Sequence, residues 1–345
     1  MEKNAIVVNG LTKKFGELVA VDNISFSVAE GEIFGFLGPN GAGKTTTIRM
    51  LCTLSRPTRG HASIAGHDIG KEKHRVREQI GLVSEKLIMY DRLTARENLK
   101  LFGKLYDIPN KKLKSKMAEL LDLVHMEKWV DKQIGTYSTG MKQRINVIRA
   151  LLNEPKVLFL DEPTLGLDPQ STAEIREFIR KINKASGTTI ILTTHMMVEA
   201  DLLCDRIGII DRGKIVALDT PENLKKMISG TSNTILEIDI ANMNSSIRTK
   251  LEELDTVNKV TLDSDTKLTV RANGDDAFDN IIDTIRGQNG KITRMKNLEP
   301  TLEDVFLHLT GRTVRDETTD KVRTAKRRRG PGGHGARSGG SRRVR

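Results

Sequence analysis

The chain has 345 residues, of which 37% are hydrophobic, and this is enough to build two domains with substantial cores. Its formal net charge is +11, but residues 321–345 hold ten Lys and Arg and no acidic residue, which leaves +1 for residues 1–320. The basic pI therefore says little about the partners of the folded part. No apolar run approaches the ~18 residues needed to span a bilayer, so a soluble protein is predicted.

Residues 1–4 lead straight into a predicted strand, so we expect no signal segment. The two cysteines, Cys52 and Cys204, lie inside apolar helical patterns. We interpret them as packed, reduced thiols of a cytosolic protein.

Two strands are predicted near the N-terminus, at residues 5–11 and 21–28, and Phe15 lies between them. An aromatic side chain in such a place packs against other apolar groups or stacks on a purine ring. The residues alone leave both interpretations open.

Residues 38–46 fit the phosphate-binding pattern G-x-x-x-x-G-K-[ST]. An apolar strand precedes the loop at residues 32–37, and apolar residues recur at helical spacing after it. Backbone N–H groups at the start of that helix are expected to bind phosphate, with Lys44 at the β- and γ-phosphates and the Thr45 hydroxyl on Mg²⁺. The nucleotide-binding residues predicted here are Gly38, Pro39, Asn40, Gly41, Ala42, Gly43, Lys44, Thr45 and Thr46.

A short strand at residues 80–83 runs into Glu85, and residues 95–152 are mostly helical. This predicts a helical insertion over about residues 86–154. One helix begins at Ser138, which is a suitable N-cap. The start of this helix is either an ordinary cap or a second anion-binding site that offers Ser138 and the Gly140 N–H.

The apolar strand at residues 157–160 ends in two adjacent carboxylates, Asp161 and Glu162. In an open α/β sheet, ligands bind at the carboxyl ends of the strands. We therefore expect Asp161 to hold Mg²⁺ and Glu162 to act on an attacking water. His195 follows the next strand, residues 188–193, and is expected to contact the γ-phosphate at the same edge.

The C-terminal part predicts a separate unit after a linker at residues 229–232. Its order of elements is βαββαβ, which is typical of a ferredoxin-like fold. An amphipathic helix then starts at Leu302 behind a capping-box pattern. The composition of residues 312–345 predicts a basic, disordered tail. The expected domains are thus residues 1–230, 231–311 and the tail.

In their order along the chain, these motifs resemble the ATP-binding subunit of an ABC transporter over about residues 5–230. Residues 38–46 resemble the Walker A loop, residues 138–144 the family signature, residues 158–164 Walker B and residues 166–168 the D-loop. Phe15 and His195 stand where the family has its base-stacking aromatic and its switch histidine. Residues 299–307 resemble the extension of daunorubicin-type ABC-2 exporters.

The resemblance implies an α/β P-loop NTPase fold, an ABC nucleotide-binding domain with an inserted helical subdomain, followed by the small α+β domain. It implies an ATP hydrolase with ATP and Mg²⁺ as its ligands, with Glu162 and His195 catalytic. Metal contacts are implied for Thr45, Asp161 and Glu85. Phe15, Glu85, Ser138, Gly140 and Asp168 join the loop residues as nucleotide contacts.

The resemblance also implies partners. Two copies are expected to pair head to tail around ATP and to drive a separate polytopic permease at the cytoplasmic face of the cell membrane. The cargo class implied is a drug or lipid-like molecule that is exported. Two residues depart from the family pattern: Thr139 stands in place of a glycine, and Glu85 in place of a glutamine.

Three alternatives compete with this interpretation. A chromosome-maintenance ATPase needs a long coiled coil between the phosphate loop and the signature, but only 94 positions separate Lys44 from Ser138 and they carry no sustained heptads. A tandem translation factor needs a second G-K-[ST] loop, which the sequence lacks. An ATPase that binds nucleic acid through the tail stays as the alternative, since a basic tail serves anionic lipid or RNA equally.

Overall fold

The computed structural model describes residues 3–86, 88–229, 233–274 and 276–311. Within these ranges the chain forms three sheets. Of the predicted linker at residues 229–232, Ser229 ends helix α8 (Pro221–Ser229), and residues 230–232 lie outside the described residues, as does the predicted tail at residues 312–345. No helix in the described ranges is long and apolar enough to cross a membrane.

The central sheet has six strands in the order β10-β9-β3-β8-β7-β6. All neighbours are parallel except β10, which runs antiparallel to β9. Every residue of β3, β7 and β8 is buried, which explains their nearly continuous apolar sequences. The strands are β3 (Ile33–Leu37), β6 (Ile80–Val83), β7 (Val157–Asp161), β8 (Thr189–Thr194), β9 (Arg206–Asp211) and β10 (Lys214–Asp219).

A second, antiparallel sheet lies beside one face of the central sheet, in the order β2-β1-β4-β5. Between the two sheets is a hydrophobic core in which the rings of Phe26, Phe34 and Phe36 contact one another. The elements of this layer are β1 (Asn4–Phe15), β2 (Leu18–Ala29), β4 (Arg59–Ile64), β5 (His67–Asp68), α1 (Lys44–Leu51) and α2 (Lys73–Gln79).

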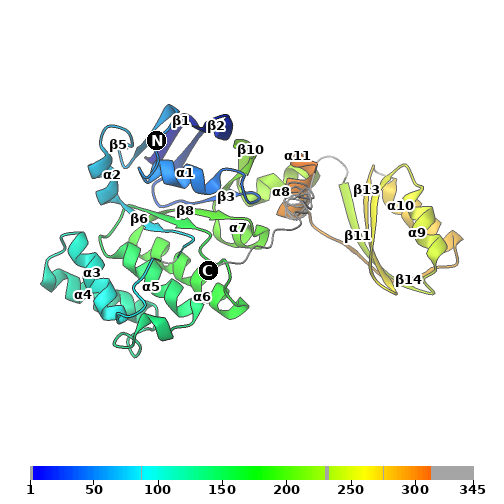
Figure 1. Ribbon diagram of the computed structural model, residues 1–345. Helices are drawn as coiled ribbons and strands as arrows, with labels where there is room; N and C mark the ends of the chain where they lie inside the picture. The colour runs from blue at the N-terminus through cyan, green and yellow to red at the C-terminus, as the bar shows by residue number, and fades with distance from the viewer. Residues whose placement is uncertain (1–2, 87, 230–232, 275, 312–345) are drawn as a thin grey trace, which may run out of the picture.

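The opposite face of the central sheet is covered by helices, with α5 and α6 against the sheet and α3 and α4 farther out (Figure 1). This confirms the predicted helical insertion between β6 and β7. The helices are α3 (Ala95–Leu105), α4 (Asn110–Leu123), α5 (Thr139–Leu151), α6 (Pro169–Ser186), α7 (Met197–Leu203) and α8 (Pro221–Ser229), with a short 3-10 turn at Ile134–Thr136.

The C-terminal unit has the predicted βαββαβ order and a four-stranded antiparallel sheet arranged β12-β13-β11-β14. Helices α9 and α10 cover one face of that sheet (Figure 1). The unit has its own apolar core, separate from both cores of the larger part. Its elements are β11 (Asn233–Ala241), α9 (Ser245–Glu252), β12 (Val257–Ser264), β13 (Lys267–Asn273), α10 (Ala277–Gly287) and β14 (Lys291–Asn297).

The last described helix, α11 (Leu302–Thr310), returns to the larger part of the molecule. It packs against α8 and α7, and its apolar face joins the same core as the helices under the central sheet. Leu302, Val305 and Phe306 are each 1% exposed there. The chain therefore leaves the larger part after α8, builds the C-terminal unit and comes back.

Candidate active site at the carboxyl edge of the central sheet

The predicted phosphate loop connects β3 to α1. Two of its glycines are required by close backbone approach. A Cβ on Gly38 would lie 2.2 Å from the Ile210 carbonyl oxygen, and one on Gly43 would lie 2.6 Å from that of Ala20. Gly43 also has φ = 109° as the N-cap of α1, a left-handed conformation that favours glycine. The loop thus starts α1 with free backbone N–H groups, as an anion site requires.

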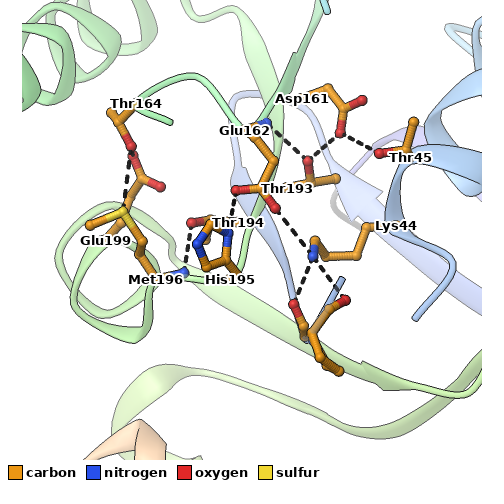
Figure 2. Close-up of polar contacts among 12 residues, drawn as sticks. Lys44, Thr45, Asp161, Glu162, Thr164, Thr193, Thr194, His195, Met196 and Glu199 are labelled. Atoms are coloured by element: carbon orange, nitrogen blue, oxygen red, sulfur yellow. Dashed lines mark hydrogen bonds and ion pairs between the residues drawn. The ribbon is translucent and has the colours of Figure 1, made fainter. Parts of the chain in front are cut away.

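Lys44 is the first residue of α1, and its side chain is only 5% exposed. The ammonium turns back along the loop and donates hydrogen bonds to the carbonyl oxygens of Gly38 at 2.7 Å and Pro39 at 3.2 Å. It also lies 3.2 Å from Glu162 Oε1 in an ion pair, without the alignment of a hydrogen bond. A buried cation is thereby held at the mouth of the loop (Figure 2).

Asp161 ends β7 and is bound by two hydroxyls. Its Oδ1 accepts hydrogen bonds from Thr45 Oγ1 at 3.0 Å and from Thr193 Oγ1 at 2.6 Å. Burial raises the pKa of Asp161, the two hydroxyls oppose that shift, and the charges of Glu162 and Glu85 add to it. A carboxylate that burial makes costly to ionise gains from a nearby cation, and a hydroxyl beside a carboxylate is an oxygen set that Mg²⁺ prefers.

Glu162 occupies a backbone turn with φ = 51°, which is unusual for a residue with a long side chain. Its N–H is held by Thr193, with 3.1 Å to both the backbone oxygen and the hydroxyl. Its Oε2 lies 2.8 Å from His195 Nδ1 (Figure 2). The carboxylate therefore lies between the Lys44 ammonium and the His195 ring.

The two groups of this pair have opposite pKa shifts. Burial opposes ionisation of Glu162, but the hydrogen bond from His195 and the charge of Lys44 outweigh it, and the pKa is lowered. The pKa of His195 is raised, chiefly by its hydrogen bond to Glu162 and against the effect of burial. The arrangement favours a carboxylate beside a proton-carrying imidazole.

An open pocket of about 300 Å³ lies over these groups. It is lined by most of the predicted loop, together with Glu85 and Glu162 from neighbouring strands. Its remaining lining residues are Ala20, Pro39, Asn40, Gly41, Gly43, Lys44, Thr45, Thr46 and Leu165. Ala42 is instead buried under the loop, where its carbonyl accepts a hydrogen bond from Gly213 N at 2.9 Å.

Three predicted contacts form a second group outside this pocket. Ser138 caps α5 by accepting a hydrogen bond from Met141 N at 3.2 Å, and Asp168 caps α6 through Ser171 N at 2.9 Å. Gly140 packs so closely on Ser171 that a Cβ would lie 2.4 Å from its hydroxyl oxygen. The starts of α5 and α6 thus pack against each other, and none of the three residues lines the pocket that contains Lys44.

Phe15 also lies outside the pocket, at the end of β1. It is 53% exposed, and the Lys13 ammonium lies 4.8 Å from the centre of its ring. The ring is therefore not part of a hydrophobic core. Of the two interpretations that the residues left open, core packing is wrong.

Sequence reasoning missed the polar residues that hold the site in place. Thr193 binds both Asp161 and Glu162, and Gln143 donates a hydrogen bond to the Pro163 carbonyl at 2.7 Å. Thr193 carried a weak signal, because it ends the predicted strand at residues 188–193, two positions before His195. Gln143 lies in the stretch that resembles the family signature, but its residue type alone carried no signal, since a polar residue near a helix start is ordinarily solvated.

A strand–loop–helix phosphate cradle that ends in a buried lysine, beside a Thr–Asp pair and an ionised glutamate, defines a P-loop nucleotide hydrolase. Comparison with known proteins narrows this class. Residues 21–165 match the family described as ABC transporter, and residues 220–310 match the ATP-binding protein DrrA1-3-like C-terminal domain.

Curated relatives match over nearly their full length. The linearmycin resistance ATP-binding protein LnrL of Bacillus subtilis is 38% identical over 89% of this chain and 98% of its own. The daunorubicin resistance ATP-binding protein DrrA3 of Streptomyces coeruleorubidus is 36% identical over 90% of this chain and 97% of its own. The chain belongs to the ABC transporter ATP-binding proteins: it is an ATPase that powers an exporter.

Solved structures agree on the fold. An ATP-binding subunit of an ABC transporter superposes with a TM-score of 0.59 at 30% identity, over 65% of this chain and 93% of its own. A dimeric ATP-binding cassette in a post-hydrolysis state, bound to ADP and Pi, gives a TM-score of 0.57 at 26% identity, over 62% of this chain and 98% of its own. Both confirm the predicted P-loop fold.

Proposed function

We propose that residues 38–46 bind the phosphates of ATP, that Lys44 binds the β- and γ-phosphates, and that Glu162 is the general base of hydrolysis. The observation that carries this proposal is the placement of the Glu162 carboxylate between Lys44 and His195 at the edge of the pocket. Its lowered pKa keeps Oε1 and Oε2 ionised near neutral pH, so the carboxylate can accept a proton from water.

In this structure Lys44 pairs with Glu162. Binding of a phosphate gives Lys44 a stronger anionic partner and frees Glu162 Oε1 for water. His195 keeps Oε2 oriented during this exchange through its Nδ1 hydrogen bond, and it is proposed to contact the γ-phosphate.

Thr45, Asp161 and Glu85 are proposed to hold Mg²⁺, which would neutralise charge on the phosphates when bound. The Thr45–Asp161 contact and the Asp161 pKa support this assignment. The described residues contain no cluster of three or more His, Cys, Asp or Glu that could cage a metal. Mg²⁺ at phosphate sites needs none, because it retains water and phosphate ligands.

Phe15 is proposed to stack on the adenine ring, since its ring is exposed and not used in a core. Ser138, Gly140 and Asp168 are proposed to contact the nucleotide of a second copy in a head-to-tail homodimer. Their place outside the pocket of their own chain, on the fixed starts of α5 and α6, supports a role in trans. Thr139 adds a side chain at that surface, and Glu85 adds charge near the phosphates.

The partner is proposed to be a separate polytopic permease, with this chain peripheral at the cytoplasmic face of the cell membrane. The cargo is proposed to be a drug or lipid-like molecule, by similarity to relatives named for linearmycin and daunorubicin resistance. Residues 1–230 are proposed as the ATPase domain, with its helical subdomain at about residues 86–154. Residues 231–311 are proposed as an accessory domain.

The tail is proposed to contact anionic lipid through its ten cations. Nucleic acid is the less favoured partner. Ferredoxin-like domains that bind RNA stack bases on aromatic side chains of the sheet, and the described strands β11, β12, β13 and β14 contain no aromatic residue.

Complementation between two inactive variants tests the head-to-tail site. Lys44→Ala disables the loop, and Ser138→Arg blocks the surface offered in trans. Each variant alone should be inactive, whereas random mixing should restore about a quarter of the parental turnover, because half of the dimers contain one intact site of two. Two differently tagged Lys44→Ala preparations, mixed in the same way, are the control. A variant mixture as inactive as its components would contradict the proposed dimer.

A further inference from the structure

Glu199 is a buried carboxyl residue that the mechanism above does not use. It lies on α7, four residues after His195, and is 1% exposed. It does not line the pocket over the phosphate loop. Burial raises the pKa of its carboxyl, the hydroxyls of Thr194 and Thr164 oppose that shift, and the negative charge of Glu162 adds to it. An acid in such a place is costly to keep, so its contacts call for an explanation.

Its main contact is a hydrogen bond to Thr164, whose Oγ1 donates to Glu199 Oε1 at 2.7 Å. Thr164 is 3% exposed and also lies 3.9 Å from the Met196 sulfur (Figure 2). The other oxygen, Glu199 Oε2, has no hydrogen-bond partner among the described residues. Thr164 follows the proposed base Glu162 by two positions, so Glu199 reaches the segment that carries the base.

That segment is a tight turn that begins at Glu162, whose φ is 51°. A hydrogen bond from Leu165 N to the Glu162 carbonyl oxygen, at 3.2 Å, closes the turn. A non-glycine residue persists in this conformation only where surrounding contacts fix it. Thr193 from β8 holds Glu162, and Gln143 from α5 holds the Pro163 carbonyl. Glu199 from α7 completes the set at Thr164.

Glu199 is connected to His195 as well. Helix α7 begins at Met197, and the Met196 N–H donates to Thr194 Oγ1 at 2.9 Å on the other side of His195. Through its bond to Thr164, the Glu199 side chain therefore connects α7, the helix after His195, to the turn that carries Glu162. A shift of either segment would change the 2.8 Å contact between Glu162 and His195.

We propose that Glu199 is a positioning residue for ATP hydrolysis, which fixes the Glu162 turn against the His195 segment through its hydrogen bond with Thr164. The inference rests on the proposed roles of Glu162 and His195. It implies that loss of the bond lowers kcat and leaves KM for ATP unchanged, because Glu199 contacts neither the loop nor the pocket.

The test is steady-state ATPase kinetics of Glu199→Ala, Thr164→Val and the double variant, beside Glu162→Gln. Displacement of a catalytic group by about 1 Å costs up to roughly 100-fold, so each single variant should lose roughly 10- to 100-fold in kcat. The double variant should lose no more than either single one, since both remove the same bond. Glu199→Gln and Thr164→Ser retain an acceptor and a donor and should stay near the parental rate.

Thermal unfolding of each variant is measured first. Thr164→Val keeps the side-chain volume, so it tests the bond even if Glu199→Ala fails to fold. Parental kcat in Thr164→Val, additive losses in the double variant, or equal losses in Glu199→Gln and Glu199→Ala would each overturn the inference. If Glu162→Gln retains full activity, the proposed function fails; if it is inactive while Thr164→Val is normal, only the role of Glu199 fails.

Discussion

The edge of the central sheet and the sheet of the C-terminal unit use polar residues in opposite ways. At the central edge Lys44, Asp161 and Glu162 are all less than 10% exposed: Lys44 pairs with Glu162, and Asp161 accepts a hydrogen bond from Thr45. In the described part of residues 233–297 no polar or charged residue is fully buried. The ion pairs described within residues 233–297 are partly or fully exposed, as between Lys267 and Glu237 at 2.9 Å, whereas Arg271 pairs outside this range with the buried Asp304 of α11.

This difference separates a region built for chemistry from one built on apolar packing alone. Burying charged groups is unfavourable unless they are paired, and the central sheet buries such groups at the proposed site of ATP hydrolysis. The C-terminal unit has an ordinary apolar core with a solvated surface, which suits a scaffold or docking role. Helix α11 connects the two, because its apolar face belongs to the core of the larger part.

The largest expected effect is a loss of stability when the buried ring of Phe306, which packs α11 into the core of the larger part, is removed. Phe306→Ala should lower the free energy of unfolding of the larger part by about 3–5 kcal/mol, because a fully buried ring leaves a cavity. The matched control is Phe278→Ala in the C-terminal unit, where the ring is 44% exposed and the loss should be small. Urea denaturation measures both. Equal losses would mean that α11 does not contribute to the larger core.

The second effect is a loss of ATP affinity, expected when the buried Lys44 is replaced but not when a lysine of the C-terminal unit is replaced. Lys44→Ala should weaken ATP binding roughly 10- to 100-fold, because a charged hydrogen-bonding group is removed from the phosphate site. Lys267→Ala removes an ion-paired lysine from the C-terminal unit and should leave ATP affinity unchanged. Calorimetric titration compares them. The contrast between the two regions breaks down if both variants bind ATP equally well.

A third effect is pH-dependent. The raised pKa of His195 means that the protonated ring stabilises the fold at pH values below about 6.5, its ordinary value, and that this contribution is lost as pH rises through the raised value. The lowered pKa of Glu162 makes its contribution present above its ordinary value of about 4.3.

His195→Gln should therefore destabilise the nucleotide-free protein more at pH 5.5 than at pH 8.5, by up to about 1 kcal/mol. His74→Gln on α2, where the side chain is 90% exposed, is the control for a general loss of charge. Thermal unfolding at both pH values makes the measurement. A His195→Gln penalty that grows with pH would contradict the assigned pair.

The smallest effect on the folded part of the chain is expected from the tail. Removing residues 321–345 takes away ten cations, each worth about 1 kcal/mol near an anionic bilayer, and should weaken binding to anionic vesicles while ATPase activity stays the same. The difference should fade at high salt. Cosedimentation with neutral vesicles is the control. Identical sedimentation with and without the tail at low salt would reject a lipid-binding tail.

Much of the fold could be predicted, because local patterns carry it. The phosphate loop, the strands that end in Asp161 and before His195, and the βαββαβ order lie close to where the sequence indicates them. No element was predicted from β4 to α2, where only alternate residues of β4 are buried and the pattern is weak. It also missed α6, although Ile175, Phe178, Ile179 and Ile182 repeat at helical spacing.

The contacts made by tertiary packing could not be predicted. The apolar face of α11 shows that it needs a partner surface but not that the surface is α7 and α8. Glu199 looks like a solvated helical residue until the fold buries it beside Thr164. Side chains that hold a catalytic turn have no fixed spacing from it, because they come from three different elements.

The most direct test of the central claim, that Glu162 drives ATP hydrolysis at this edge, is single-turnover hydrolysis by Glu162→Gln. The amide keeps the shape of the side chain but cannot accept a proton, so the rate should fall about 10²- to 10⁴-fold. ATP should still bind and hold the dimer together. Glu237→Gln in the C-terminal unit should behave like the parent. Hydrolysis by Glu162→Gln at the parental rate would contradict the account.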